Sequence, residues 1–146
     1  MRRLLILLAM GLPSVAVAAT ADDVLAQAAA DCADFDNGVF SAAPDAVQAV
    51  DLTGDGQPET VVDTGKFQCS SAASLYGGSG GTGLTVIVGG EAVEFLAEVW
   101  TVTEFAGRNV LLILHNGVDC GGIGVDPCVE ALVWGDGRFM TVRPGG

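Results

Sequence analysis

The sequence predicts a mainly β fold of the α+β kind: an antiparallel sheet or small sandwich with one short N-terminal helix and two disulfides. Short segments alternate between apolar and polar residues, and turn-forming pairs such as Gly89-Gly90 and Asp136-Gly137 separate them. Apolar residues with helical spacing occur near the N-terminus. The four cysteines are an even number, as expected for two disulfides in an exported protein.

Residues 1–19 have the composition of a secretory signal peptide. Arg2 and Arg3 provide the charged start, Leu4 to Leu12 the apolar run, and residues 16–19 the small side chains of a cleavage site. The run is too short to span a bilayer, and later apolar stretches are interrupted by charged residues and glycines. We therefore expect residues 20–146 to form a single exported domain, periplasmic or secreted, without a membrane span.

The mature chain is expected to be strongly acidic. Without the signal it has eighteen acidic and four basic residues, a formal charge of −14. Such a field repels nucleic acids and anionic lipids, and it attracts cationic proteins, cationic peptides and divalent metals. We expect no nucleic-acid partner. A cationic protein or peptide is the partner class that fits, and solubility alone is the alternative reason for the charge.

The first predicted element is a short amphipathic helix from Asp22 to Asp31. Thr20 or Asp22 can cap its N-terminus, and Val24 and Leu25 begin its apolar stripe. The next segment, Phe35 to Pro44, is rich in turn-forming residues and is predicted to form turns.

The cysteines that follow the signal are Cys32, Cys69, Cys120 and Cys128, and three pairings are open. Cys120–Cys128 is favoured because the chain between them is rich in glycine and can turn back, which leaves Cys32–Cys69. A zinc site of His115, Cys120 and Cys128 is the alternative, but no C-x-x-C spacing supports it.

Residues 51–59 have the one spacing that implies a specific chemistry. Strands at Val47 to Asp51 and Glu59 to Asp63 flank them as a hairpin. Calcium takes six to eight oxygen ligands, and Gly56 stands where the chain must turn sharply. A bare Asp-Gly turn with solvated carboxylates is the alternative. The expected ligands of a structural calcium ion are the residues at alternate positions, Asp51, Thr53, Asp55, Gln57 and Glu59.

This stretch resembles the D-x-[DN]-x-D-G loop of EF-hands, dockerins and FG-GAP/VCBS repeats. Val62 stands where an EF-hand requires a bidentate Glu, and Asp63 is one residue further on and can substitute. Val61-Val62 and the preceding Pro58-Glu59 are similar to FG-GAP/VCBS units, in which the loop leads into a strand. Only one copy of the loop is present, so we expect a single compact domain rather than a propeller.

The C-terminal half is predicted to be β-rich. Ser70 to Gly83 lacks periodicity, and within it Gly77 to Gly83 is predicted to be a mobile or tightly turning loop, without the Gly-Lys-Ser/Thr of a phosphate loop. The strand at Val110 to His115 is apolar throughout and is expected to be buried on both faces. The other predicted strands are Leu84 to Val88, Ala92 to Ala97, Glu98 to Phe105, and Val129 to Trp134 paired with Phe139 to Val142.

The order of these features resembles a family of small exported bacterial proteins of unknown function. The shared features are the signal, a helix ending in Cys32, the D-x-T-G-D-G loop, Phe67-x-Cys69, and a Cys-Gly-Gly-Ile-Gly…Pro-Cys loop before Trp134-Gly-Asp-Gly-Arg. In such relatives the glycine-rich stretch often holds a further cysteine pair. The resemblance implies no activity.

We expect the protein not to be an enzyme. His115 is the only histidine, and no G-x-S-x-G motif accompanies the serines that a catalytic triad requires. The leading hypothesis is a non-enzymatic binding or interaction module with a structural calcium loop. One alternative is an acidic inhibitor of a cationic partner such as a lysozyme-type wall hydrolase, since residues 71–76 faintly resemble the loop of such inhibitors. A small hydrolase using His115 is the second alternative.

Overall fold

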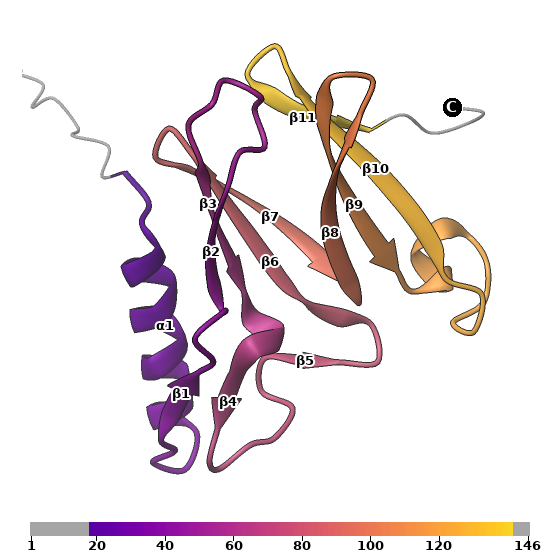
Figure 1. Cartoon of the computed structure of the whole chain (residues 1–146). Helices are drawn as coiled ribbons and strands as arrows, with labels where there is room; N and C mark the ends of the chain where they lie inside the picture. The colour runs from indigo at the N-terminus through magenta and orange to yellow at the C-terminus, as the bar shows by residue number, and fades with distance from the viewer. Residues whose placement is uncertain (1–17, 142–146) are drawn as a thin grey trace, which may run out of the picture.

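The computed structural model describes residues 18–141 and shows a mainly β fold, as predicted (Figure 1). Most of the predicted signal lies outside these residues. One helix, α1 (Ala21–Asp34), packs beside the strands, and two short 3-10 helices, η1 (Thr64–Lys66) and η2 (Gly117–Cys120), interrupt the loops. The helix is longer than predicted at both ends. Thr20 caps it, with its hydroxyl accepting from the amide of Asp23 and the Asp23 carboxylate accepting from the amide of Thr20.

The strands form two larger antiparallel sheets and one small one. The first sheet has the order β2-β3-β6, with β5 and β7 also paired to β6, and the second has the order β11-β10-β9-β8. The strands of the first sheet are β2 (Val47–Val50), β3 (Glu59–Asp63), β5 (Gly77–Gly78), β6 (Gly81–Val88) and β7 (Glu91–Ala97). Those of the second are β8 (Val99–Phe105), β9 (Arg108–His115), β10 (Cys128–Gly135) and β11 (Arg138–Thr141). β1 (Phe40–Ala42) pairs with β4 (Phe67–Cys69).

The main core contains buried side chains from both larger sheets. Val61 and Val86 come from β3 and β6, while Leu111 and Ile113 come from β9. The alternation along each strand turns one set of side chains toward this core, and burying each of them stabilises the fold by about 1.5–3 kcal/mol. β9 lies between β8 and β10, and its Leu111 and Ile113 belong to the core. On its other face Leu112 and Leu114 are only partly buried, so the predicted burial of both faces is confirmed only in part.

A second cluster joins α1 to the first sheet. Ala28 of the helix packs with Val62 and Phe67. Tyr76 contacts the Phe67 ring edge to face, and its hydroxyl donates to the Ala28 carbonyl at 2.6 Å. The Cys32–Cys69 disulfide closes this region, and Cys120–Cys128 closes the loop before β10, so both predicted pairings are confirmed. The zinc alternative is wrong because both of its cysteines are disulfide-bonded.

Gly77 to Gly83 was predicted to be a mobile or tightly turning loop. A tight turn is present at Ser79 and Gly80, but the prediction of a mobile loop is wrong for the residues on either side, which lie in paired strands. β5 pairs with the start of β6, and residues 81–83 belong to β6. Gly81 has φ of +109°, and a Cβ there would lie 2.7 Å from the carbonyl oxygen of Ala97 on the neighbouring strand. Glycine therefore permits a close strand approach here. β1 was also missed, since its three residues lie in a stretch dominated by turn signals.

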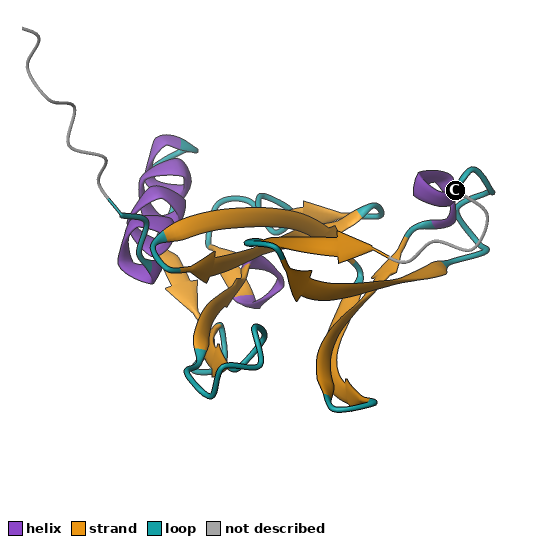
Figure 2. Cartoon of the chain, turned by 90° about the horizontal axis from the view of Figure 1, so that it is seen from above, coloured by secondary structure: helices purple, strands orange, loops and turns teal. Residues whose placement is uncertain are grey.

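Two hairpins project from the same side of the molecule (Figure 2). One is formed by β2 and β3, with residues 51–58 at its tip, and the other by β8 and β9, with Ala106 and Gly107 at its tip. The predicted calcium loop therefore lies at the tip of the first hairpin, and a groove lies between the two hairpins.

Candidate functional site

The predicted calcium loop is folded around its own carboxylates. Asp51 accepts hydrogen bonds from the amides of Gly54 at 2.7 Å and Gly56 at 3.0 Å, one on each carboxylate oxygen. Asp55 accepts from the amide of Gln57 at 2.8 Å. Gly54 and Gly56 have φ of +78° and +85°, which glycine adopts at least cost. The sharp turn expected at Gly56 is confirmed.

Glu59, the first residue of β3, holds the beginning of the loop through hydrogen bonds to its carboxylate. Its side chain is buried, and one carboxylate oxygen accepts from the amides of Leu52 at 2.7 Å and Thr53 at 3.0 Å. The other oxygen accepts from the Thr53 hydroxyl at 3.4 Å. These contacts tie the end of the loop to its beginning, so Glu59 has a structural role that its place in the spacing pattern did not reveal.

The loop meets part of what calcium requires. Its donors are all oxygens, as this hard cation prefers, and Asp51 and Asp55 lie in the same turn. The Glu59 carboxylate is engaged with loop amides, so a calcium ion would depend on Asp51 and Asp55 together with uncharged oxygens, including Thr53 and Gln57. Within residues 18–141, no group of three or more His, Cys, Asp or Glu side chains is arranged to hold a metal ion.

Asp63 does not take part in this loop. It lies at the opposite end of β3, where one carboxylate oxygen accepts from the Trp100 indole at 2.9 Å and the other from the Gly65 amide at 2.8 Å. The expectation that Asp63 substitutes for a missing calcium ligand is therefore wrong. Asp63 is four residues beyond Glu59 along the extended strand, at about 3.3 Å per residue.

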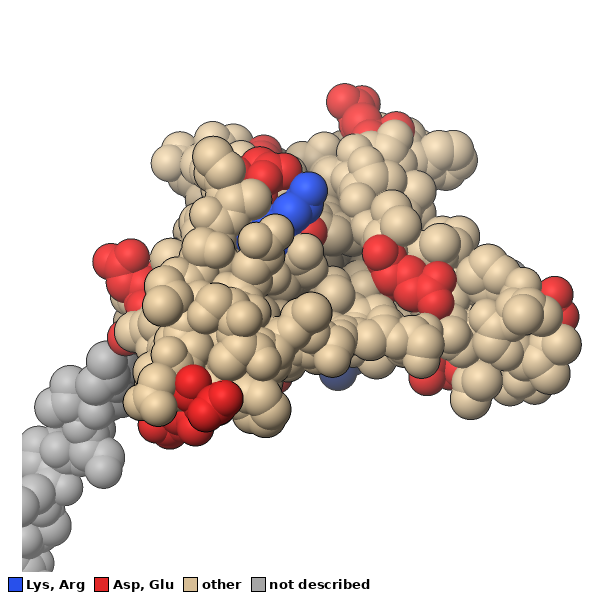
Figure 3. Space-filling model, turned by 90° about the horizontal axis from the view of Figure 1, so that it is seen from below, with Lys and Arg blue, Asp and Glu red and all other residues tan. Residues whose placement is uncertain are grey.

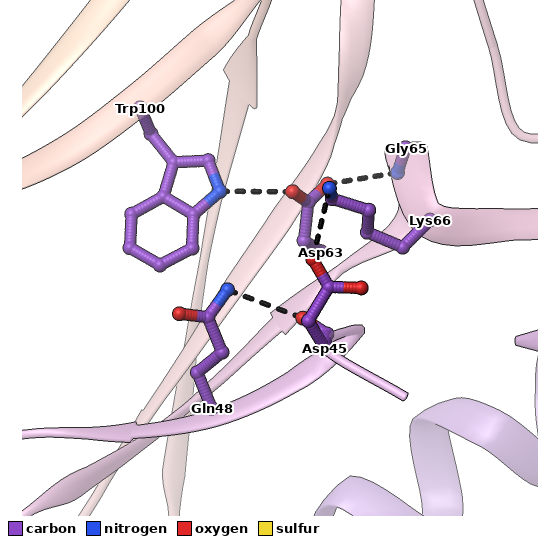
Figure 4. A network of polar contacts seen from close by, with 6 residues as sticks. All are labelled: Asp45, Gln48, Asp63, Gly65, Lys66 and Trp100. Atoms are coloured by element: carbon purple, nitrogen blue, oxygen red, sulfur yellow. Dashed lines mark hydrogen bonds and ion pairs between the residues drawn. The ribbon is translucent and has the colours of Figure 1, made fainter. Parts of the chain in front are cut away.

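Asp63 instead lies in the groove between the two hairpins (Figure 4). This groove has a volume of about 470 Å³ and opens on the side seen in Figure 3. Asp63 is only 9% exposed, so its bond to Trp100 links β3 to β8 in a partly dehydrated setting. The lining residues are Gln48, Val50, Asp63, Lys66, Thr82 and the run from Ala97 to Val102.

An ion pair lies at the base of the first hairpin. The Lys66 ammonium is 3.0 Å from a carboxylate oxygen of Asp45, and both side chains are exposed. The hydrogen bond from Lys66 lowers the pKa of Asp45, and the same bond to Asp45 raises the pKa of Lys66. Gln48 donates to the Asp45 carbonyl at 3.1 Å, so the segment entering β2 is fixed on two sides.

Acidic side chains dominate the surface. All eighteen acidic residues of the chain lie within the described part, with only Lys66, Arg108 and Arg138 as described basic residues. Figure 3 shows acidic groups on several separate parts of this face, and a basic side chain beside the hollow. The acids are thus spread over the helix, the strands and the turns rather than gathered at one point.

The residues on which the hydrolase and inhibitor alternatives rest, His115 and the segment 71–76, make structural contacts. His115 pairs with Glu130, with 2.9 Å between the imidazole nitrogen and a carboxylate oxygen, and both side chains are largely buried. In the segment compared with inhibitor loops, Tyr76 is half-buried against Phe67, and the Ser71 hydroxyl donates to the Phe35 carbonyl. This segment therefore supports the packing of α1.

The groove is the feature that sequence reasoning missed. Its walls come from β2 and β8, which lie about fifty residues apart, and no local pattern reports their proximity. The one weak signal was Trp100, since a tryptophan in a half-buried strand usually finds a partner for its indole N–H.

Comparison with protein-family models, curated proteins and solved structures finds no match for this chain. Among the described residues, no helix is long and apolar enough to cross a membrane. The candidate function therefore has to be argued from the loop and the groove themselves.

Proposed function

We propose that this chain is an exported, non-enzymatic binding protein whose β2–β3 hairpin is stabilised by calcium at residues 51–59. The observation that carries the proposal is the pair of acidic side chains Asp51 and Asp55 in one turn closed by backbone amides, with Glu59 holding the start of the loop from β3. The amides offset part of the negative charge. Calcium would neutralise the rest through Asp51 and Asp55, which keep further lone pairs for an ion.

The position of the loop connects calcium to binding. β2 is one wall of the groove and leads directly into the loop. The Asn109 side chain of β9 donates to the Asp51 carbonyl at 2.8 Å, so the first residue of the loop also contacts the second hairpin. An ion that orders the loop would thereby also limit changes in the distance between the two hairpins at the end of the groove near their tips.

Thermal unfolding of the oxidised protein in calcium and in chelator tests the proposal. We expect a dissociation constant on the order of 10⁻⁴–10⁻³ M. A calcium concentration about ten times this constant then adds about 1.4 kcal/mol to the free energy of unfolding and raises Tm by about 5 °C. Asp55→Asn should abolish this increase. Asp136→Asn, at the tip of the β10–β11 hairpin, is the matched control and should retain it.

The proposal also predicts how the calcium-dependent increase in Tm changes with pH. Ion-bound carboxylates have lowered pKa values, so the stability contributed by calcium should be lost on acidification. Absence of any Tm change up to millimolar calcium, or an equal change in Asp55→Asn, would contradict the calcium part of the proposal.

A second candidate is the capture of a cationic protein, for instance a lysozyme-type wall hydrolase. It is supported by the excess of acidic over basic residues in the described chain. Binding to lysozyme should be measured at low and high salt, because an association driven by charge weakens as salt screens it. If lysozyme is not captured even at low salt, this candidate is wrong.

A further inference from the structure

The groove is bordered by two strand edges. Within residues 18–141, β2 pairs only with β3, and β8 pairs only with β9. Both edges face the hollow, since Gln48 and Val50 of β2 and residues 99–102 of β8 line it. Edge strands carry backbone donors and acceptors that a further strand can satisfy.

The free backbone groups can be assigned along β2. The Asp63 amide donates to the Ala46 carbonyl at 2.9 Å, which places the backbone of Ala46 toward β3. Because backbone direction alternates along an antiparallel strand, Gln48 also faces β3 while Val47 and Ala49 face outward. Ala49 is exposed.

The same reasoning applies to β8. The two-residue turn at Ala106 and Gly107, with φ of +52° and +73°, makes Phe105 and Arg108 the hydrogen-bonded pair. Counting back along β8, the backbone groups of Val102 and Trp100 face away from β9. Both strands run toward their hairpin tips, which lie at the same end of the molecule (Figure 1). A strand running the opposite way would be antiparallel to both.

The gap is bridged by side chains rather than by backbone hydrogen bonds. Trp100 reaches Asp63 near one end, and Asn109 reaches Asp51 near the other. The hairpins are therefore further apart than the strand spacing of about 4.8 Å. Between the bridges, Val50 and Val102 pack on the core and provide an apolar floor.

Charge indicates what kind of segment fits. Of the charged lining residues, Lys66 is paired with Asp45, and Asp63 accepts from Trp100 and Gly65. Glu98 is therefore the exposed acidic side chain that a basic residue of a bound segment can meet. Residues 99–103 of β8 contain no charge that would deter an added strand, whereas the opposite edge of the first sheet, β7, carries Glu91 and Glu94.

We propose that an extended, basic segment of a partner polypeptide binds as an added strand between β2 and β8, with apolar side chains on the groove floor and a basic side chain beside Glu98. The inference rests on the proposed binding function and specifies its partner class. It requires no calcium, so the two can fail separately.

The test uses the purified oxidised protein and a labelled, acetylated hexapeptide of alternating Lys and Val. Fluorescence anisotropy should show binding that an alternating Glu and Val hexapeptide lacks. N-methylation of alternate peptide amides should weaken binding by about tenfold, since it removes backbone donors without changing side chains. On binding, the amides of Ala49 and Val102 should become protected from hydrogen exchange.

Two matched variants locate the site. Ala49→Pro blocks the edge of β2 and should weaken hexapeptide binding by about tenfold. Ala92→Pro places the same substitution at an outward-facing, exposed position on β7, and it should leave binding within about twofold. Circular dichroism checks that both variants fold, and the N-methylated peptide gives an answer that needs no variant.

Equal binding of the normal and N-methylated peptides, or equal loss in both variants, would overturn the inference. So would protection of Ala49 and Val102 by dimerisation without peptide, which would assign the groove to a second copy. Lysozyme capture without hexapeptide binding would leave the second candidate function standing while rejecting the added strand.

Discussion

The two hairpins that flank the groove are closed in different ways. The β8–β9 hairpin ends in two residues, Ala106 and Gly107, whose positive φ values fit the twist of the strands. The β2–β3 hairpin ends in eight residues, 51–58, organised by carboxylates that accept backbone amides. The first closure is a property of the backbone, whereas the second depends on charged side chains, and under the proposed function we expect it to respond to calcium.

The largest expected effect comes from removing the support of the longer loop. Glu59→Ala leaves the amides of Leu52 and Thr53 without their acceptor in a buried place, and it should destabilise the protein by about 2–4 kcal/mol. Glu104→Ala on the exposed part of β8 is the matched control, with an expected change within about 0.5 kcal/mol. Urea unfolding measures both, and equal effects would show that the two closures do not differ.

The bridge at the base of the groove should come next. Trp100→Phe keeps most of the ring but removes the donor to Asp63, which is only 9% exposed. We expect a loss of about 1–3 kcal/mol, because the carboxylate loses a partner in a partly dehydrated place. The midpoint of urea unfolding gives the value, and an unchanged midpoint would mean that packing alone holds the two hairpins in place.

The bridge near the tips should be weaker. Asn109→Ala removes the donor to the Asp51 carbonyl, with an expected loss of about 0.5–1.5 kcal/mol. Thermal unfolding gives this loss of stability. Amide hydrogen exchange in calcium and in chelator then tests whether the hydrogen bond couples the loop to the second hairpin. If it does, calcium should still slow exchange in the loop of the variant but should no longer affect the exchange of β9 amides.

The smallest expected effect concerns the base of the first hairpin. The pKa of Asp45 is lowered from its ordinary value of 3.8 by the hydrogen bond from Lys66. A group whose pKa is lowered on folding stabilises the protein above its ordinary pKa, and this contribution is lost as the pH falls through the lowered value. In Asp45→Asn the free energy of unfolding should therefore fall slightly less below about pH 4 than in the unmodified protein, as measured by urea unfolding at several pH values. Both side chains are exposed, so salt should weaken the effect.

Sequence alone predicted the features that depend on local pattern. The β2–β3 hairpin follows from alternation, the turn at Asp136 and Gly137 from turn chemistry, and the two disulfides from cysteine number and loop composition. The strand residues 81–83 were missed because glycine signals flexibility in sequence, while here it permits close approach to Ala97.

The site was only partly predictable for a related reason. Spacing identified Asp51 and Asp55 as neighbours in one turn, but it placed Glu59 among the ligands when its carboxylate lies under the loop. Asp63 fits the loop pattern in sequence, yet the extended geometry of β3 carries it to the far end of the strand. The groove depends on two edges brought together by tertiary packing, which no local pattern encodes.

Residue-resolved hydrogen exchange across both hairpin tips, with calcium and with chelator, tests the central claim most directly. We expect calcium to slow exchange at the amides of Gly54, Gly56 and Gln57, while the amide of Gly107 in the shorter turn stays unchanged. Unchanged exchange at all four amides up to millimolar calcium would contradict the claim, as would an equal change at both tips.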